Sequence, residues 1–190
     1  MKKLVLAAAL ALLAAPALAH TGQGVSSGLL HGMLHPITGA DHLLAMLAVG
    51  LWSGLALTRR VWAGAATFMG AMVFGAVLGW SGMAIPHVET AIAASVAVFG
   101  LLAIFARAGQ SRQLTAASLV AIGGFAACHG HAHAAETTGQ AVAYLAGFLI
   151  TTGALHLAGI AVARSVAASR IAQRVAGAAL VASGAWLVSG

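Results

Sequence analysis

Acidic residues are almost absent from this chain of 190 residues, which contains only three, Asp41, Glu89 and Glu136. Charged residues of both signs make up 6% of the sequence, whereas a soluble domain carries about 25%. This composition cannot form the surface of a soluble protein, because 61% of the residues are hydrophobic. We therefore expect an all-α polytopic membrane protein, a compact bundle of about six transmembrane helices.

Cysteine occurs once, as Cys128, so the chain cannot form an intrachain disulfide. The formal charge of +6 does not indicate a nucleic-acid partner. The basic residues lie in short connections between apolar segments, where they set the topology of a membrane protein. The G-x-x-x-x-G-K-[ST] motif is also missing, so the chain has no ATPase of its own.

The N-terminus has the pattern of a secretory signal peptide. Two lysines precede an apolar stretch over 4–15, which is too short to span a bilayer comfortably, and an A-x-A cleavage site ends at Ala19. We predict a cleavable signal peptide over 1–19 and a single transmembrane helical domain over 20–190. The alternative is an uncleaved anchor helix.

Six apolar segments follow the signal, and most have about the 20 residues that a transmembrane helix needs. They are 25–57, 61–81, 88–106, 114–134, 139–163 and 171–189. The first is too long for one straight span. Because proline removes a backbone donor, we predict a short helix near 25–35, a break at Pro36 and Gly39, and a full span over 39–57.

Alternate connections between these segments contain arginines, namely those after the first, third and fifth segments, and Arg174 lies at the start of the last segment beside the third of them. By the positive-inside rule, those connections are cytoplasmic, which places the mature N-terminus and the C-terminus in the periplasm of a bacterial inner membrane. A helix rises about 1.5 Å per residue, so Asp41 and His129 each lie about 26–27 Å from the cytoplasmic face. Both positions are then near the periplasmic mouth.

The first polar motif surrounds the predicted break. His31 and His35 share a helical face before it, and Asp41 and His42 begin the helix after it. Broken helices mark ion sites in transporters, because the irregular backbone must lie inside protein or line a cavity. The alternative is that Asp41 acts on the helix dipole as an N-terminal cap.

The second motif places His129, His133 and Glu136 at positions i, i+4 and i+7, on one face of a helix, while His131 points elsewhere. Imidazole and carboxylate groups are ligands for divalent transition metals. A polar patch that hydrogen-bonds neighbouring helices is the alternative. We predict a metal site formed by His35, Asp41, His42, His129, His133 and Glu136.

Further residues are secondary candidates for the metal path. Glu89 lies in the first turn of a helix that Pro86 is expected to begin, where an acid also favours the helix dipole. His156, about 12 Å from the cytoplasmic face, is either a relay or an interhelical hydrogen-bonding group. The secondary candidates are His31, His131, His87, Glu89 and His156.

Both motifs resemble those of the HupE/UreJ family of hydrogenase- and urease-accessory membrane proteins. The first signature is similar to the stretch over 34–46, with His35 and Asp41-His42, and the second, F-H-G-x-A-H-G-x-E, to the stretch over 128–136. Cys128 replaces the phenylalanine and Ala134 replaces the second glycine. The resemblance implies that the six primary residues are the functional positions.

The resemblance implies a nickel permease, not an enzyme, that supplies hydrogenase or urease, with cytoplasmic nickel chaperones as partners. The metal ion would be transported cargo, with no cofactor permanently bound. Cobalt and copper are alternative cargoes, because Cys128 and His131 add a thiol and an imidazole to the motif. The same set of ligands also suits a zinc-dependent intramembrane hydrolase or a metal-binding accessory subunit.

Overall fold

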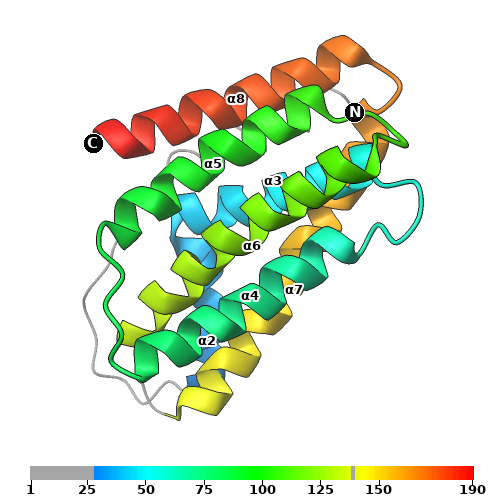
Figure 1. The fold of residues 1–190 in the computed structure, drawn as a ribbon. Coiled ribbons are helices and arrows are strands. Elements are labelled where there is room, and N and C mark those ends of the chain that lie inside the picture. The colour runs from blue at the N-terminus through cyan, green and yellow to red at the C-terminus, as the bar shows by residue number, and fades with distance from the viewer. Residues whose placement is uncertain (1–27, 138–139) are drawn as a thin grey trace.

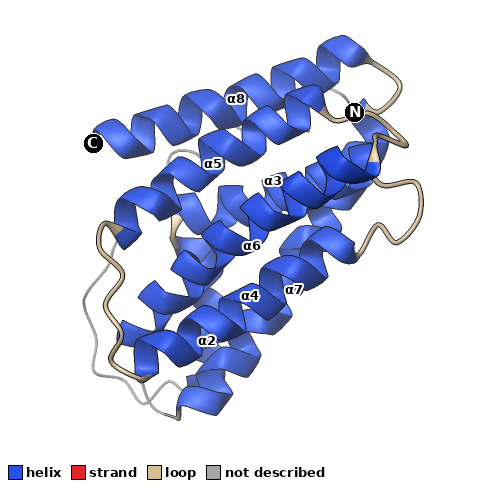
Figure 2. Ribbon diagram, viewed as in Figure 1, coloured by secondary structure: helices blue, strands red, loops and turns tan. Residues whose placement is uncertain are grey.

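The computed structural model describes residues 28–137 and 140–190, and this part of the chain contains seven α-helices and no strand (Figures 1 and 2). The predicted signal peptide lies outside the described residues. The helices are α2 (Gly28–Thr38), α3 (Ala40–Ala56), α4 (Ala63–Trp80), α5 (Val88–Phe105), α6 (Arg112–Ala135), α7 (Ala141–Val166) and α8 (Arg170–Ser189). The all-α prediction is confirmed for these residues.

The predicted break in the first segment is present, but it lies at Gly39 alone. Helix α2 continues through Pro36 to Thr38, and α3 then begins at an angle of 80° to it. Proline removes one backbone donor, which the helix tolerates two residues before its end. Gly39 has an extended backbone, with φ −90° and ψ 118°, and this residue redirects the chain.

Four helices, α4, α5, α7 and α8, are long and apolar enough to cross a membrane, and the bent pair α2–α3 provides a fifth span if it is counted as one. The polar end of α6, with its three histidines, lowers the hydropathy of that 24-residue helix. Helical spans satisfy their backbone hydrogen bonds internally, as a bilayer requires. The protein is therefore a multi-pass membrane protein.

The helices pack mainly in four pairs: α4 with α6, α5 with α8, and α7 with both α2 and α3. Glycine allows this close packing. A Cβ at Gly75 of α4 would overlap the backbone of Ala127 in α6, and one at Gly50 of α3 would overlap the His156 carbonyl in α7. A Cβ at Gly54 or Gly79, four residues further along the same two helices, would likewise overlap Ala163 of α7 or Ala134 of α6, so both G-x-x-x-G spacings lie at helix interfaces.

Large apolar side chains occupy both the inside and the outside of the bundle. Trp52, Phe68 and Phe99 are fully buried. In contrast, Val120 and Ile171 are about three-quarters exposed, which suits a surface that faces acyl chains.

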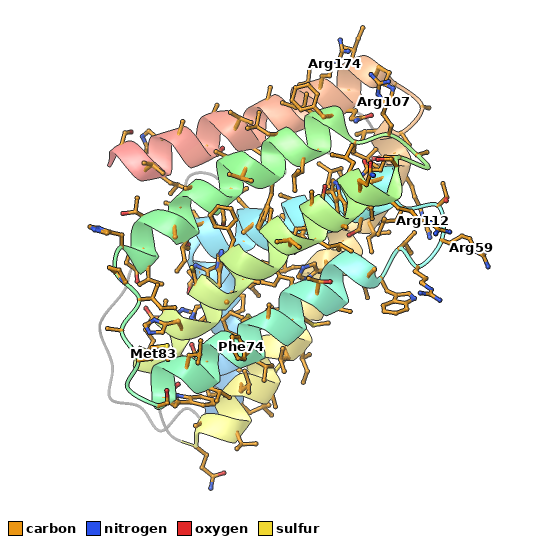
Figure 3. The ribbon with its side chains drawn as sticks, in the orientation of Figure 1. Arg59, Phe74, Met83, Arg107, Arg112 and Arg174 are labelled. Atoms are coloured by element: carbon orange, nitrogen blue, oxygen red, sulfur yellow. The ribbon has the colours of Figure 1, made fainter. Side chains whose placement is uncertain are left out.

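The arginines lie together at one end of the bundle. Figure 3 shows Arg59, Arg107, Arg112 and Arg174 at this end, and Met83 toward the opposite end. Ser111 and Ser169 begin α6 and α8 there, because their hydroxyl groups accept hydrogen bonds from backbone N–H groups of the first turn. The two ends of the molecule therefore differ in charge.

Candidate metal site

Three helices bring the two histidine motifs together at the end of the bundle opposite the arginines. His35 lies in the last turn of α2, and His42 lies in the first turn of α3. His129 and His133 lie one turn apart near the end of α6, and Glu136 directly follows that helix. The bend at Gly39 is what directs two successive helices of the first motif at α6.

A buried group of three histidines forms the centre of this region. One candidate ligand atom from each of His42, His129 and His133 lies within 4.8 Å of the others. All three residues are buried, and the His129 side chain is fully so. The ring centroid of His42 is 4.8 Å from that of His129 and 4.4 Å from that of His133. This separation suits three imidazoles that surround one ion.

Hydrogen bonds determine which ring nitrogen of each histidine carries the proton. A carboxylate only accepts hydrogen bonds, so the Nδ1–H of His42 donates to Asp41 Oδ1 at 2.5 Å, and the Nδ1–H of His133 donates to Glu136 Oε2 at 3.1 Å. In the neutral form of each ring, Nε2 then carries the lone pair, and both Nε2 atoms are buried without a hydrogen-bond partner.

His129 has the opposite tautomer because its ring contacts Ser95 of α5. The hydroxyl of Ser95 donates to the carbonyl of Ile92 at 2.6 Å, so its oxygen accepts from the Nε2–H of His129 at 3.1 Å. The lone pair of His129 is therefore on Nδ1, which is also buried and without a partner. Each of the three histidines thus offers one free lone pair, and an acceptor holds its other nitrogen. Metal-ligating histidines have this arrangement in proteins.

Gly39 also makes room for the Asp41–His42 hydrogen bond. A Cβ at this position would lie 3.0 Å from both Asp41 Oδ1 and His42 Nδ1, which is closer than side chains normally approach. The same glycine therefore redirects the chain and admits the carboxylate that orients His42.

A second, more exposed group lies beside the first and shares His133 with it. Candidate ligand atoms of His35, His133 and Glu136 lie within 4.8 Å of one another. His35 Nε2 donates to Glu136 Oε2 at 3.0 Å, and the Glu136 side chain is 51% exposed. Hydrogen bonds from His133 and His35 hold the pKa of the Glu136 carboxyl well below its usual range, so it is ionised at neutral pH. This group is therefore a more exposed, anionic neighbour of the buried one.

Aromatic rings surround the histidines and exclude water from the space beside them. The Phe148 ring lies 4.2 Å from that of His133, the Phe68 ring lies 5.4 Å from that of His129, and Tyr144 packs beside His35. The cavity beside His133 has a volume of only about 10 Å³, room for about one water molecule. Because His42, His129 and His133 are themselves buried, an ion held between their rings must lose most of its hydration shell. Sequence reasoning missed these aromatics and Ser95, because nothing in the sequence distinguishes them from core residues.

The structure places all six primary residues in this region, but it separates several of the secondary ones. At the edge of this region the His31 ring stacks against His35 and lies tilted beside Tyr144, with ring centroids 5.8 Å apart. His131 points away, as expected, and its Nε2–H donates to the Met83 carbonyl at 2.6 Å. His87 and Glu89 are exposed and belong to neither histidine group.

Two local expectations are wrong. Helix α5 begins at Val88 and not at Pro86, because His87 has a left-handed backbone, with φ 55°, that cannot belong to the helix. The hydrogen bond of His156 is not interhelical: its Nδ1–H donates at 2.7 Å to the carbonyl of Thr152, one turn earlier in α7.

The fold and site define a multi-pass helical membrane protein with a buried three-histidine centre, and comparisons with known proteins agree with the sequence motifs. The profile of the HupE / UreJ protein family matches residues 8–187. Protein HupE of Rhizobium leguminosarum bv. viciae is 42% identical over 186 residues, which are 95% of this chain and 95% of the relative. No solved structure matches the chain. The chain therefore belongs to the HupE/UreJ family, and the predicted family membership is confirmed.

Proposed function

We propose that this protein is an inner-membrane permease that carries a divalent transition-metal ion, with nickel as the expected cargo, from the periplasm to the cytoplasm. The buried lone pairs of His42, His129 and His133 carry the proposal. Three neutral imidazoles beside two carboxylates can offset the free-energy cost of dehydrating a divalent ion. They do so without the permanent binding expected of thiolate ligands, so the ion can leave the site. The ion would serve the maturation of hydrogenase or urease, with cytoplasmic nickel chaperones as the receiving partners.

The proposed orientation follows from the separation of charges. The arginine end is cytoplasmic by the positive-inside rule, so the histidine site opens toward the periplasm. In this orientation α6 is a sixth span, and the C-terminus is periplasmic. Inward movement of a divalent ion is then favoured by the membrane potential, by about 4.6 kcal/mol per 100 mV.

The two histidine groups lie in the order that capture requires. The ion first meets the ionised Glu136 and His35, which are partly exposed, and then passes by way of the shared His133 to the three buried rings. Asp41 and Glu136 act mainly by orienting histidines, since each accepts a ring N–H. This role differs from the direct ligation that the motif alone predicted for both carboxylates.

Asp41 provides a test of this orienting role. Asp41→Asn retains an acceptor oxygen but removes the charge that polarises His42, so metal affinity should fall about 10- to 100-fold. Isothermal titration of the purified protein with Ni²⁺ measures this change. Glu89→Gln is the matched control, because Glu89 is also an acid in the first turn of a helix but is exposed and outside both groups. An equal loss in both variants would show that only the overall negative charge matters.

The next candidate ligand on the proposed path is His156. The Phe68 ring lies between two histidines, 5.4 Å from the His129 ring and 5.1 Å from the His156 ring. Because the Nδ1–H of His156 donates to a backbone carbonyl, its Nε2 carries a lone pair, and this atom is buried without a partner. The hydroxyl of Thr152, one turn away, is also buried and unpartnered. Movement of the Phe68 ring would connect this polar pair to the capture site.

The variant His156→Phe keeps an aromatic ring against Phe68 and removes the lone pair. We expect Ni²⁺ affinity at the capture site to stay within about twofold, while the uptake rate falls about tenfold, because a second ligand stabilises the ion only after it has left the three histidines. Equilibrium titration and stopped-flow uptake into proteoliposomes separate the two quantities. An unchanged uptake rate would remove His156 from the path.

The deciding experiment is uptake of Ni²⁺, Co²⁺, Cu²⁺ and Zn²⁺ into liposomes that contain the purified protein. Saturable uptake of one ion, lost in a variant of the three-histidine group, establishes a permease and identifies its cargo. Three histidines with an open fourth position also hold catalytic zinc in hydrolases. Stoichiometric binding without uptake would therefore favour the hydrolase or the accessory subunit over the permease.

A further inference from the structure

The arginine end of the molecule has a positive charge that the protein itself does not balance. Beyond two N-terminal lysines the basic residues are Arg59, Arg60, Arg107, Arg112, Arg164, Arg170 and Arg174. All three acids of the chain lie toward the other end, and Glu89 is about 27 Å from Arg107 along α5. That distance exceeds the Debye length of about 10 Å at 0.1 M salt. The neutralising charge must therefore come from outside the chain.

Three of these arginines line one cavity between the end of α5 and the start of α8. The cavity has a volume of about 390 Å³, and its lining consists of Ile104, Phe105, Arg107, Arg170 and Arg174. No lining residue is acidic. Figure 3 shows Arg107 and Arg174 close together at this edge of the bundle. Like charges that converge on one cavity repel each other unless an anion lies between them.

A buried polar contact fixes one of the three guanidinium groups. Nη1 of Arg170 donates to the carbonyl of Ala106 and to Oε1 of Gln173, both at 3.0 Å. Gln173 is itself buried, and its Nε2 donates to the carbonyls of Ala103 at 2.8 Å and Ala106 at 2.9 Å. These hydrogen bonds hold Arg170 in position at the cavity. They use only Nη1 of a guanidinium group that has five N–H donors, so further donors remain for a ligand.

The other side of the cavity is apolar. Phe105 is 70% exposed, and Ile104 lies beside it at the end of the membrane-spanning helix α5. A soluble anion would satisfy the arginines and leave this apolar wall in contact with water. A phospholipid supplies a phosphate for the guanidinium groups and acyl chains for Phe105. Basic pockets between helices at a membrane surface bind anionic headgroups in this way.

We propose that this cavity is a binding site for one anionic phospholipid, with its phosphate between Arg107, Arg170 and Arg174 and its acyl chains against Phe105. Ile104 of the cavity is nine residues along α5, about 14 Å, from Ser95, which hydrogen-bonds His129 of the metal site. The ligand class of the cavity does not depend on metal transport. The bound lipid would hold α8 against α5 at the membrane surface.

The test compares two double variants of the full chain. Arg107→Gln/Arg174→Gln removes two charges from the cavity and spares the Arg170 contacts. Arg59→Gln/Arg112→Gln removes two charges from the same end, outside the cavity lining. Binding of phosphatidylglycerol and of phosphatidylcholine is measured by native mass spectrometry, with inorganic phosphate as a competitor. Thermal unfolding in detergent verifies that both variants fold.

We expect one phosphatidylglycerol, and no phosphatidylcholine, to be retained by the unaltered protein. Retention of phosphatidylglycerol should fall about 10- to 30-fold in the cavity variant, because this is the loss in binding expected when two arginines are removed from an anionic lipid surface. In the control variant, retention should fall less than about threefold. Equal losses in both variants, or undiminished retention in the cavity variant, would overturn the proposal. Displacement of the lipid by millimolar inorganic phosphate would instead assign the cavity to a soluble phosphate ligand.

Discussion

The variant His129→Ala is expected to lower the affinity for Ni²⁺ by at least about 100-fold and to abolish uptake into proteoliposomes. Loss of a group that only orients a metal ligand lowers metal affinity about 10- to 100-fold. This substitution removes a proposed ligand itself, so a larger loss of affinity is expected. His129 is fully buried, and Ser95 holds its ring so that Nδ1 faces no competing donor. The remaining two histidines of the group cannot compensate, because their ring positions are fixed by Asp41 and Glu136.

Loss of a buried ring also leaves a cavity, so binding and folding must be separated. The matched control is His131→Ala, two residues away in the same helix, since His131 contacts the Met83 carbonyl and not the site. A ligand at about 100 times its dissociation constant stabilises a folded protein by about 2.7 kcal/mol. Ni²⁺ should therefore raise the unfolding temperature of the His131 variant but not of the His129 variant. An equal rise in both would place the ion elsewhere.

The second large effect is expected at Gly130, which lies between His129 and His133, the two histidines of α6 that belong to the metal site. A Cβ here would overlap the carbonyl of Met72 in α4 and lie 2.9 Å from its Cα. Backbone atoms cannot rotate out of the way as side chains do, so Gly130→Ala should force α4 and α6 apart. We expect a loss of about 1–3 kcal/mol in stability and a marked loss of metal affinity, because the movement displaces His129 and His133.

Gly124 offers a control in the same helix. A Cβ there meets nothing within 4 Å, so Gly124→Ala adds the same methyl group without a collision. It should leave stability unchanged or raise it slightly, because alanine is the better helix former. Thermal unfolding and Ni²⁺ titration of the two variants check this. If both behave alike, close packing of α4 on α6 does not maintain the site.

Much of the fold could be predicted from the sequence. Hydrophobic segments of about 20 residues in a chain with few charges usually form transmembrane helices. The helix boundaries agree with the apolar segments to within a few residues, except in the first segment and at its break. The sequence predicts a break at Pro36 and Gly39, but α2 continues through Pro36 to Thr38, since one missing donor near a helix end is tolerated, and the chain turns at Gly39 alone.

The sequence by itself determined which residues are candidates for the metal site. In an apolar chain with only three acids and nine histidines, a polar residue inside the membrane needs a partner. The i, i+4 spacing of His129 and His133 places both on one helical face. Helix rise and the arginine pattern also predicted the shared depth of the two motifs. These inferences need only local periodicity and the solvent properties of the bilayer.

Only the tertiary structure decided how those residues are used. The angle of 80° between α2 and α3, and the glycine contacts that set the helix separations, bring His42 against His129. The pairing of Ser95 with His129, and the position of Phe68 between His129 and His156, join residues from different helices. Such contacts depend on helix crossing angles and rotations, which the packing of all side chains determines together and no single segment encodes.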